Sequence, residues 1–470
     1  MKKSNFKNIP SIQKISEQDE FIELTKLFSR DLLINELRII LNIYRESKNN
    51  DKVISMDSIF NELESHMKEL LEEHPKKIIN ASGVILQTNF GRAPLPNQAV
   101  IAMQNISTNY SDLEYDLKEN KRGGRLNKLK KLINRLTNAE DALVVNNNAS
   151  AVFLVLKALC SSKEVLVSRS ESVEIGGGFR VPDVITESDA ILIDVGTTNK
   201  TYVKDYESKI TANTGCILLI HQSNFKIEGF TFKPSIKDIV EMAKKHSVPV
   251  FYDLGSGCLI DTTQYSLEYE PTVKDAISDG VDLVFFSGDK LIGGPQAGII
   301  AGKKEYIQII ENHPLTRALR LDKVLLSALN ATLQLYLSDK YKEIPLWNIL
   351  NKKNKDIYNL LENWKENLNK NKLSNFNNLV IFEVCKSSTM IGGGSIPEQS
   401  ISSYSLVINC EGLPTNAETI NKCLKSRNTP ILTRIKDNKL YIDPLTILHD
   451  EENSVFTALN EEMKNLNIVN

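Results

Sequence analysis

The first 75 residues show a helical pattern of apolar and polar positions. Apolar side chains return every three or four positions between Leu32 and Tyr44, with charged residues at the positions between them. A second repeat of this kind begins at Met56 and ends before Pro75, a residue that a helix interior excludes. The pattern predicts a small helical module over residues 1–75. By spacing alone, such a module is most often a packing or oligomerisation appendage.

From about residue 76 the pattern changes to short, continuous apolar runs that alternate with helical segments. Such runs are typical of strands buried on both faces. Their alternation with helices predicts an α/β layered domain with a mostly parallel sheet. The predicted strands are residues 142–145, 165–167, 190–193, 216–220, 248–252 and 283–286. The pattern stops near residue 335, so we place this domain at residues 76–338.

The remainder, residues 339–470, begins with a helical stretch rich in lysine and asparagine. Strand-like pieces follow at 379–382 and 405–408. Turn-forming residues come later, at Lys436-Asp437-Asn438 and at Asp443-Pro444. This order predicts an α+β C-terminal domain.

Composition narrows the class of protein. The chain has 470 residues, 41% of them hydrophobic and 25% charged, which is typical of a globular protein of two or three domains. The formal net charge of −2 creates no global positive field, so a nucleic-acid partner would need a local basic surface. The 6 cysteines are scattered, with no C-x-x-C pair and no histidine at ligand spacing, so we expect neither a metal site nor a disulfide framework.

Targeting features are absent from the pattern. The N-terminal segment is polar and lacks the apolar core of a secretory signal. No apolar stretch approaches the ~20 residues needed to span a bilayer. We therefore expect a cytoplasmic protein without a membrane partner.

Three of the predicted strands end at residues that carry chemistry, and active sites of open α/β sheets gather at the carboxyl ends of strands. The first strand leads into Asn146–Ala151, where a helix start offers free N–H groups to an anion, although a plain helix cap is the more common role. Asp253 ends another strand, where an acid is most often a cap or a metal ligand. Lys290 follows a third, and the glycine-rich run after it indicates close backbone approach rather than an exposed helix face.

Together these three strand ends suit one ligand, pyridoxal 5'-phosphate. This cofactor needs a phosphate cradle, a carboxylate that keeps its pyridine nitrogen protonated, and an amine that forms a Schiff base. We expect Asp253 to hold the ring nitrogen, and Lys290 to bind the cofactor and later to move protons. The order of phosphate loop, Asp and Lys resembles the fold-type I pyridoxal-phosphate enzymes. The predicted cofactor-binding residues are Asn148, Ala149, Ser150, Asp253, Ser287 and Lys290.

Longer runs resemble one family of that fold. They are Ile79–Gly83, Thr88–Ala93, Tyr110–Asp116, Lys121–Arg125, Val173–Gly177, Val195–Lys200, Phe286–Lys290 and the stretch from His313 to Lys323. In this order, and with Ile9-Pro10-Ser11 at the start, they resemble the bacterial selenocysteine synthases, the L-seryl-tRNA(Sec) selenium transferases, over nearly the whole chain. Two departures are Phe90, where the family commonly has Leu, and Arg427-Asn428-Thr429-Pro430, where a Gly- and Pro-rich turn is usual.

The resemblance implies a reaction and further site residues. In the family, L-seryl-tRNA(Sec) loses its β-hydroxyl to give aminoacrylyl-tRNA, and selenium from selenophosphate adds to yield L-selenocysteinyl-tRNA(Sec). It places selenophosphate at Arg92, Arg317 and Arg320, whose planar guanidinium groups suit phosphate oxygens. Asp289 is expected to take part in catalysis as an orienting acid or a neighbour of the anion. By spacing alone, Arg317 and Arg320 would be one helix face, and Arg92 a loop salt bridge.

The resemblance also implies partners. In the family the N-terminal helical module recognises the tRNA, and the chains form a homo-oligomer, at least a dimer and by resemblance a decamer. Here the segment Glu62–Glu73 is acidic, so we expect the tRNA surface on the first half of the module. The basic residues of that half are Lys2, Lys3, Lys7, Lys14, Lys26, Arg30, Arg38 and Arg45.

Alternatives remain open from the sequence. A related fold-type I lyase, acting on a small amino acid or an amino sugar acid, would share the cofactor residues but would not need the helical module. A non-catalytic tRNA-binding protein would not need an intact Asp253 and Lys290. Arg169 and Glu171 are candidates for stacking on the cofactor ring. Gly392–Ser395 is either close to the substrate or only a flexible turn.

Overall fold

The computed structural model describes residues 9–46, 55–176, 178–370, 381–396, 399–412 and 415–466. It forms two compact units, Met1–Lys77 and Ile78–Asn470, each of which is described by itself. Some residues named above lie outside the described ranges: Lys2, Lys3, Lys7, Gly177, and residues 379–380 of one predicted strand.

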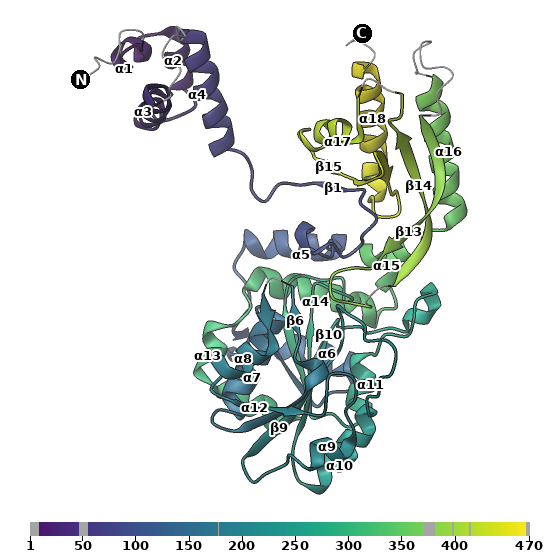
Figure 1. Ribbon diagram of the computed structural model, residues 1–470. Helices are drawn as coiled ribbons and strands as arrows, with labels where there is room; N and C mark the ends of the chain where they lie inside the picture. Colours follow the sequence, from purple (N-terminus) through teal and green to yellow (C-terminus); the bar gives the residue numbers. More distant parts are fainter. Residues whose placement is uncertain are drawn as a thin grey trace, which may run out of the picture. The chain divides into compact units, whose positions relative to one another are not determined.

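The first unit is helical, as its pattern predicts (Figure 1). Its helices are α1 (Ile12–Ser16), α2 (Asp19–Leu24), α3 (Arg30–Glu46) and α4 (Met56–Leu70). Ser11 and Ser55 are the N-caps of α1 and α4, and each hydroxyl accepts a hydrogen bond from the backbone N–H three residues further on.

The apolar repeat of α3 divides between two faces. One face is buried and packs against α4 through Leu33, Leu37, Ile40 and Leu41. Three other apolar side chains of this helix stay exposed: Leu32, Ile39 and Ile43.

The second unit is built on a seven-stranded sheet with the order β4-β12-β11-β10-β9-β5-β8. The strands are β4 (Asp141–Val145), β5 (Glu164–Ser168), β8 (Ile191–Val195), β9 (Thr214–Ile220), β10 (Val250–Gly255), β11 (Leu283–Ser287) and β12 (Gly298–Gly302). Only β12 runs antiparallel to its neighbours, and the other pairs in this sheet are parallel. The predicted α/β class, the mostly parallel sheet and all six predicted strands are confirmed.

The apolar runs do not predict the seventh strand, β12. Glycines disfavour strands in a single sequence, and this strand begins and ends with one. Close packing requires glycine at the first position of β12. A Cβ on Gly298 would lie 2.0 Å from the carbonyl oxygen of Asn147.

Two helical layers bury the two faces of the sheet. Alternate side chains of β4 show the division, since Val145 joins one apolar core and Val144 the other. Helices of the first layer are α7 (Asn148–Leu159), α8 (Val181–Glu187) and α12 (Lys304–Asn312). Helices of the second are α6 (Asn127–Thr137), α10 (Ile236–Lys245), α11 (Val273–Ser278) and α14 (Lys323–Leu337).

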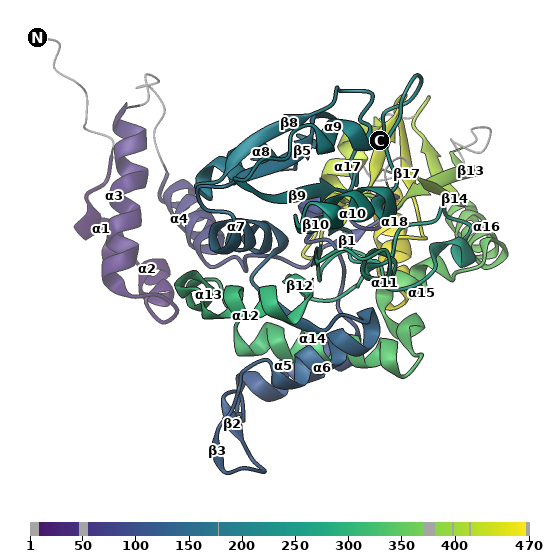
Figure 2. The same ribbon diagram turned by 90° about the horizontal axis from the view of Figure 1, so that it is seen from below.

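Shorter helices and hairpins lie outside this core. The further helices are α5 (Asn97–Ser107), which lies along α14, α9 (Val203–Glu207) and α13 (Pro314–Ala318). Two short hairpins are β2 (Tyr115–Asp116) with β3 (Lys121–Arg122), and β6 (Glu174–Ile175) with β7 (Phe179–Arg180). Figure 2 shows the β2–β3 hairpin extending away from α5 and α6.

The rest of the second unit is α+β, as predicted, with an antiparallel sheet of order β13-β14-β17-β16. Its elements are α15 (Pro345–Leu350), α16 (Asn354–Lys370), β13 (Phe382–Met390), β14 (Ser400–Asn409), α17 (Ala417–Lys425), β15 (Ile431–Leu432), β16 (Arg434–Lys436), β17 (Lys439–Ile442) and α18 (Glu452–Leu466). The predicted turn joins β16 to β17, and Asp437 and Asn438 have φ of 51° and 55° there. A boundary at residue 338 remains a prediction.

Distant parts of the chain meet beside this sheet. The short strand β1 (Ile79–Asn80) pairs in parallel with β15. The segment Arg427-Asn428-Thr429-Pro430, which departs from the family pattern, precedes β15. An ion pair links it to α18, with 3.1 Å between Arg427 Nη1 and Glu462 Oε1. Within the described residues, no helix has the length and apolar character to cross a membrane.

Candidate active site

A cavity of about 260 Å³ lies where several strands of the large sheet end. Ligand pockets of proteins start at about 300 Å³, so this one suits a small molecule. Residues in and just after the carboxyl-terminal parts of β4, β9, β10 and β11 provide most of its wall. The lining residues are Arg92, Asn147, Asn148, Ala149, Gly176, Ile220, His221, Ser223, Asp253, Gly255, Ser287, Asp289, Lys290 and Gln296.

Lys290 is a buried amine in this cavity, with only 6% of its surface exposed. Its Nζ donates a hydrogen bond to the carbonyl oxygen of Gly394 at 3.2 Å. Burial, and then the positive charge of Arg92, lowers the pKa of Lys290. The fraction of Lys290 in the neutral form, which is the nucleophilic one, is therefore larger than in an exposed lysine.

Asp253 is a buried carboxylate on β10, the strand next to β11. Its Oδ1 accepts a hydrogen bond from Asn148 Nδ2 at 2.8 Å. Burial raises the pKa of Asp253, whereas that hydrogen bond and the charges of Lys290 and His221 act in the opposite direction. A cationic group on a ligand would restore the ionised form.

The loop after β4 has a mixed role. Asn147 caps α7, because its Oδ1 accepts the backbone N–H of Ser150 at 2.8 Å. Asn148 and Ala149 line the cavity, whereas Ser150 does not. Asn148 Oδ1 is buried and has no hydrogen-bond partner among the described residues.

Arg92 and Asp289 form an ion pair at the cavity wall, with 2.7 Å between Nη1 and Oδ2. Arg92 has a φ of 63°, a left-handed conformation that costs a non-glycine residue free energy. Its Nε is buried and lacks an acceptor in the described part of the chain. The site thus holds an arginine that is strained, only partly paired, and able to meet an anion.

The other two predicted arginines do not line this cavity. Arg317 is exposed on α13. Arg320 follows that helix, forms a backbone bridge to Val145 at the end of β4, and extends its Nη1 to 3.6 Å from Glu114 Oε1. Their part in the site remains a prediction.

The structure adds site residues that the sequence analysis did not single out, foremost His221, Ser223 and Gly255. His221 and Ser223 follow the predicted strand at 216–220, so the carboxyl end of that strand is the feature that could have indicated them. The two candidates for ring stacking have other partners. Arg169 pairs with Asp194, and Glu171 accepts the backbone N–H of Ile220 and pairs with Lys233.

The glycine run near residue 393 belongs to the site. Gly392, Gly393 and Gly394 have φ of 78°, 61° and 73°, which side chains rarely adopt. A Cβ on Gly394 would lie 2.9 Å from Lys290 Nζ, and one on Gly393 would lie 2.3 Å from the carbonyl oxygen of Leu86. The geometry places Gly394 of the Gly392–Ser395 segment beside Lys290 at the cavity, and closeness to the substrate remains a prediction.

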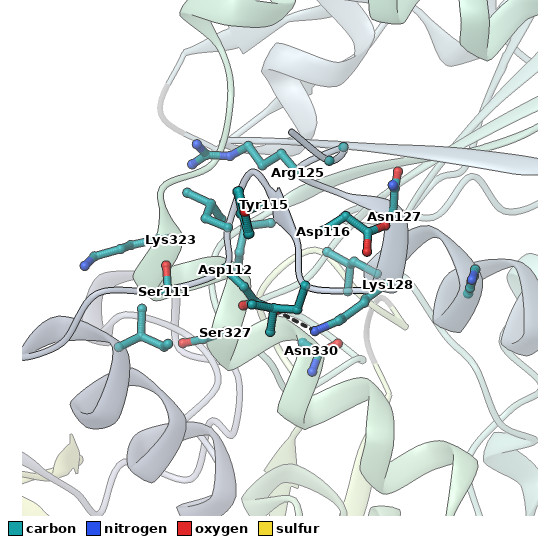
Figure 3. Close-up of a pocket in the computed structure, with 18 of the residues that line it drawn as sticks. Ser111, Asp112, Tyr115, Asp116, Arg125, Asn127, Lys128, Lys323, Ser327 and Asn330 are labelled. Carbon is teal, nitrogen blue, oxygen red and sulfur yellow. Dashed lines mark hydrogen bonds and ion pairs between the residues drawn. The ribbon is translucent and has the colours of Figure 1, made fainter. Parts of the chain in front are cut away.

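A second, larger cavity of about 540 Å³ lies under the β2–β3 hairpin, against α6 and α14. Figure 3 shows Asp112 and Lys128 joined beside it, with 2.8 Å between Lys128 Nζ and Asp112 Oδ2. In the ranges that the structure describes, no group of three or more His, Cys, Asp or Glu side chains is arranged to hold a metal ion.

Comparisons with known proteins identify the family of the chain. The family model of L-seryl-tRNA selenium transferase matches residues 78–448. The L-seryl-tRNA(Sec) selenium transferase of Alkaliphilus oremlandii is 40% identical over 465 residues, which cover 97% of this chain and 98% of that protein. The enzyme of that name from Clostridium botulinum (strain Loch Maree / Type A3) is 41% identical over 469 residues, 99% of each chain.

Among solved structures, D-glucosaminate-6-phosphate ammonia-lyase is similar, with a TM-score of 0.57 and 18% identity over 85% of this chain and 98% of that one. This likeness concerns the fold alone, and it confirms the predicted fold class. The length and identity of the sequence matches decide the family: the chain belongs to the L-seryl-tRNA selenium transferases.

Proposed function

We propose that this chain converts L-seryl-tRNA(Sec) to L-selenocysteinyl-tRNA(Sec), with selenophosphate as selenium donor and pyridoxal 5'-phosphate as cofactor. One observation carries the proposal: a buried Lys290 and a buried Asp253 share a cavity at the ends of neighbouring strands. The chain that holds them matches curated selenium transferases over nearly its full length.

The residues of the cavity fit pyridoxal phosphate. Lys290 offers an amine of lowered pKa, and Asp253 a carboxylate whose raised pKa a protonated ring nitrogen would lower. The start of α7 provides the dipole end of a helix, with Ala149 and Ser287 at the cavity wall. The unpartnered Oδ1 of Asn148 is a further polar atom that a ligand would satisfy.

When bound, the cofactor supplies a carbonyl group for the substrate amine and a ring that takes up the electron pair of the α-carbon. The chain's own residues do the rest. We expect Lys290 Nζ, in its neutral form, to take the α-proton and to deliver a proton to the departing β-hydroxyl. Gly394 holds that amine by its carbonyl oxygen, and Asn148 fixes the orientation of the Asp253 carboxylate.

We assign the donor anion to Arg92, Arg317 and Arg320. Support is direct only for Arg92, which stands in the cavity with an unpaired Nε. Asp289, the residue before Lys290, pairs with that guanidinium group. We propose that its part in catalysis is to hold Arg92 in place.

For the tRNA we propose the exposed side of α3 in the first unit. Arg38 and Arg45 each donate a hydrogen bond to an asparagine three residues earlier, at 3.1 and 2.8 Å. With Arg30 they form an exposed basic row on one helix.

Charge reversal of these three arginines should weaken tRNA binding. It should also flatten the salt dependence of binding, by about one unit of slope for each phosphate that is no longer neutralised. Reversal of Lys68, exposed on α4 of the same unit, is the control. Equal affinity in the triple variant would contradict the assignment.

The remaining parts of the proposal concern organisation. We propose a tRNA-binding module at 1–75, a catalytic domain at 76–338 and a C-terminal domain at 339–470, in a cytoplasmic homo-oligomer. Resemblance to the family indicates a decamer, and light scattering should then give ten times the mass of the 52.9-kDa chain. A monomer at working concentration would contradict this part.

One experiment tests the function. The cofactor-loaded protein is incubated with selenophosphate and with seryl-tRNA(Sec), other seryl-tRNAs or free serine. We expect selenium to enter the first substrate alone, and Lys290→Ala to abolish both the reaction and the visible absorbance of the bound cofactor. Conversion of free serine alone would favour the related lyase. Absence of cofactor absorbance in the unsubstituted protein would overturn the cofactor assignment.

A further inference from the structure

His221 stands beside the proposed cofactor carboxylate and has no part in the mechanism above. It directly follows β9, and its backbone N–H donates to the carbonyl oxygen of Asp253 at 2.8 Å. Its imidazole ring lines the same cavity as Asp253 and Lys290. The ring is mostly buried, with 19% of the side chain exposed.

Both ring nitrogens of His221 have partners from other elements. Nε2 lies 3.2 and 3.3 Å from the two carboxylate oxygens of Glu270, in the segment before α11. Nδ1 lies 3.4 Å from the hydroxyl of Tyr252 on β10. The ring is therefore held from two sides.

Glu270 is the buried carboxylate that faces His221. Its side chain is 3% exposed, and among the described residues no Lys or Arg pairs with it. A buried carboxylate without a cation is costly, and the remedy at hand is a protonated imidazole. Glu270 therefore lies in position to hold a protonated His221.

A positive charge on His221 would stabilise the ionised form of Asp253. Its hydrogen-bond partner Asn148 is neutral, and the Lys290 amine must itself be neutral to react. Of the two cations of the chain that lower the pKa of Asp253, His221 is then the one left until Lys290 takes up the α-proton.

We propose that His221, held by Glu270, is a positioning residue that keeps Asp253 ionised during the reaction. The inference rests on the proposed function, because Asp253 needs its negative charge only opposite a cofactor ring nitrogen. The groups that face the imidazole are Glu270, Tyr252, Asp253 and Lys290, so a neutral Lys290 leaves one cation between two carboxylates.

The first test needs neither cofactor nor substrate. Solid-state NMR of the cofactor-free full chain, labelled with nitrogen-15 in histidine, reports whether each ring carries one proton or two. His221→Gln identifies the signal of His221 among the 6 histidines. We expect two protons on the His221 ring at neutral pH, and one in Glu270→Gln. A singly protonated ring in the unsubstituted chain would overturn the proposal.

The second test uses the loaded enzyme. Without the His221 charge, the carboxylate of Asp253 takes up a proton more readily, so the acid limb of the rate against pH should move upward in His221→Gln by about 1 pH unit. His221→Lys should move it back. The control is His246→Gln, which breaks a His–Glu pair of 3.1 Å on the surface of the same unit.

The outcomes separate the inference from the function on which it rests. An unshifted acid limb in His221→Gln, with only a lower Tm, would mean a structural role and overturn the inference. Loss of selenium transfer in the unsubstituted protein would instead overturn the proposed function. The NMR result decides the charge of His221 even if the glutamine variant folds poorly, since Glu270→Gln leaves His221 in place.

Discussion

Two cavities of the second unit differ in size and in the burial of the charged side chains that line them. The larger, about 540 Å³, lies under the β2–β3 hairpin, and the smaller, about 260 Å³, lies at the sheet edge. At the larger cavity Lys128 and Asp112 are exposed and paired with each other, whereas the side chain of Arg125 is mostly buried and pairs with Glu114. Charges at the smaller one, Asp253, Asp289 and Lys290, are buried.

The comparison teaches that the free-energy cost of burying charged groups, and not the volume of a cavity, singles out the candidate site. Exposed ion pairs add about 0–1 kcal/mol each, and their removal changes little. A buried lysine of lowered pKa and a buried aspartate of raised pKa both oppose folding, so they indicate a function that requires them. Among the described residues that line the larger cavity, no lysine or aspartate is buried.

The largest expected effect comes from removing the buried amine. Lys290→Met should lower selenium transfer by at least about 1,000-fold, because nucleophile and proton carrier are removed together. It should also raise the free energy of unfolding near neutral pH. The sign follows from the lowered pKa of Lys290. Near neutral pH the unfolded chain binds a proton at this lysine more readily than the folded chain does. The free energy of unfolding of the wild type therefore rises with pH until the ordinary lysine pKa of 10.5 is reached.

The stability gain of Lys290→Met should therefore shrink as pH rises, which urea unfolding of the cofactor-free protein at neutral and alkaline pH measures. Lys128→Met, at the larger cavity, is the matched control and should leave turnover unchanged. A gain that grows with pH would contradict the buried, neutral state of Lys290.

The next effect concerns the two aspartates. Asp253→Asn should lower turnover by about 100-fold or more, because an amide cannot keep a ring nitrogen protonated. Asp112→Asn breaks only an exposed pair and should change stability by less than about 0.5 kcal/mol and leave turnover as it is. Equal losses in the two variants, measured under identical cofactor loading, would remove the distinction between the cavities.

A smaller effect is expected from the glycine run. Gly394→Ala places a Cβ 2.9 Å from Lys290 Nζ, and a shift of that amine should lower turnover by about 10-fold. The control is Gly229→Ala, which has a φ of 98° and open space around the added carbon. Both variants carry backbone strain, so a similar fall in Tm with a loss of turnover in Gly394→Ala alone is the expected result.

The smallest effect is expected at the larger cavity itself. Lys118 and Lys131 line it on the exposed side, and reversal of both charges should leave turnover on seryl-tRNA within about 2-fold, since exposed charges act weakly in salt. A larger loss, accompanied by a changed KM for the tRNA, would show that the hairpin cavity takes part in binding and would break the comparison.

How far the sequence predicts the site depends on where each residue lies along the chain. Asp253 and Lys290 end or follow apolar runs, so strand prediction alone sends both to one sheet edge. His221 ends such a run too, but a single histidine is an ordinary residue until Glu270 is seen beside it. Gly394 is beyond prediction of this kind, because it reaches Lys290 from the segment between β13 and β14, 104 positions along the chain.

By itself, the sequence determined the α/β class, the helical first unit, the positions of six strands, and the family to which the chain belongs. Local periodicity and long matched runs carry that information. Only the tertiary structure decided which polar atoms meet: the Asn148–Asp253 hydrogen bond, the Arg92–Asp289 pair, and the His221–Glu270 pair. The physical reason is burial. A charge acquires its reactive state from what surrounds it in space, and that surrounding comes from segments that the sequence keeps apart.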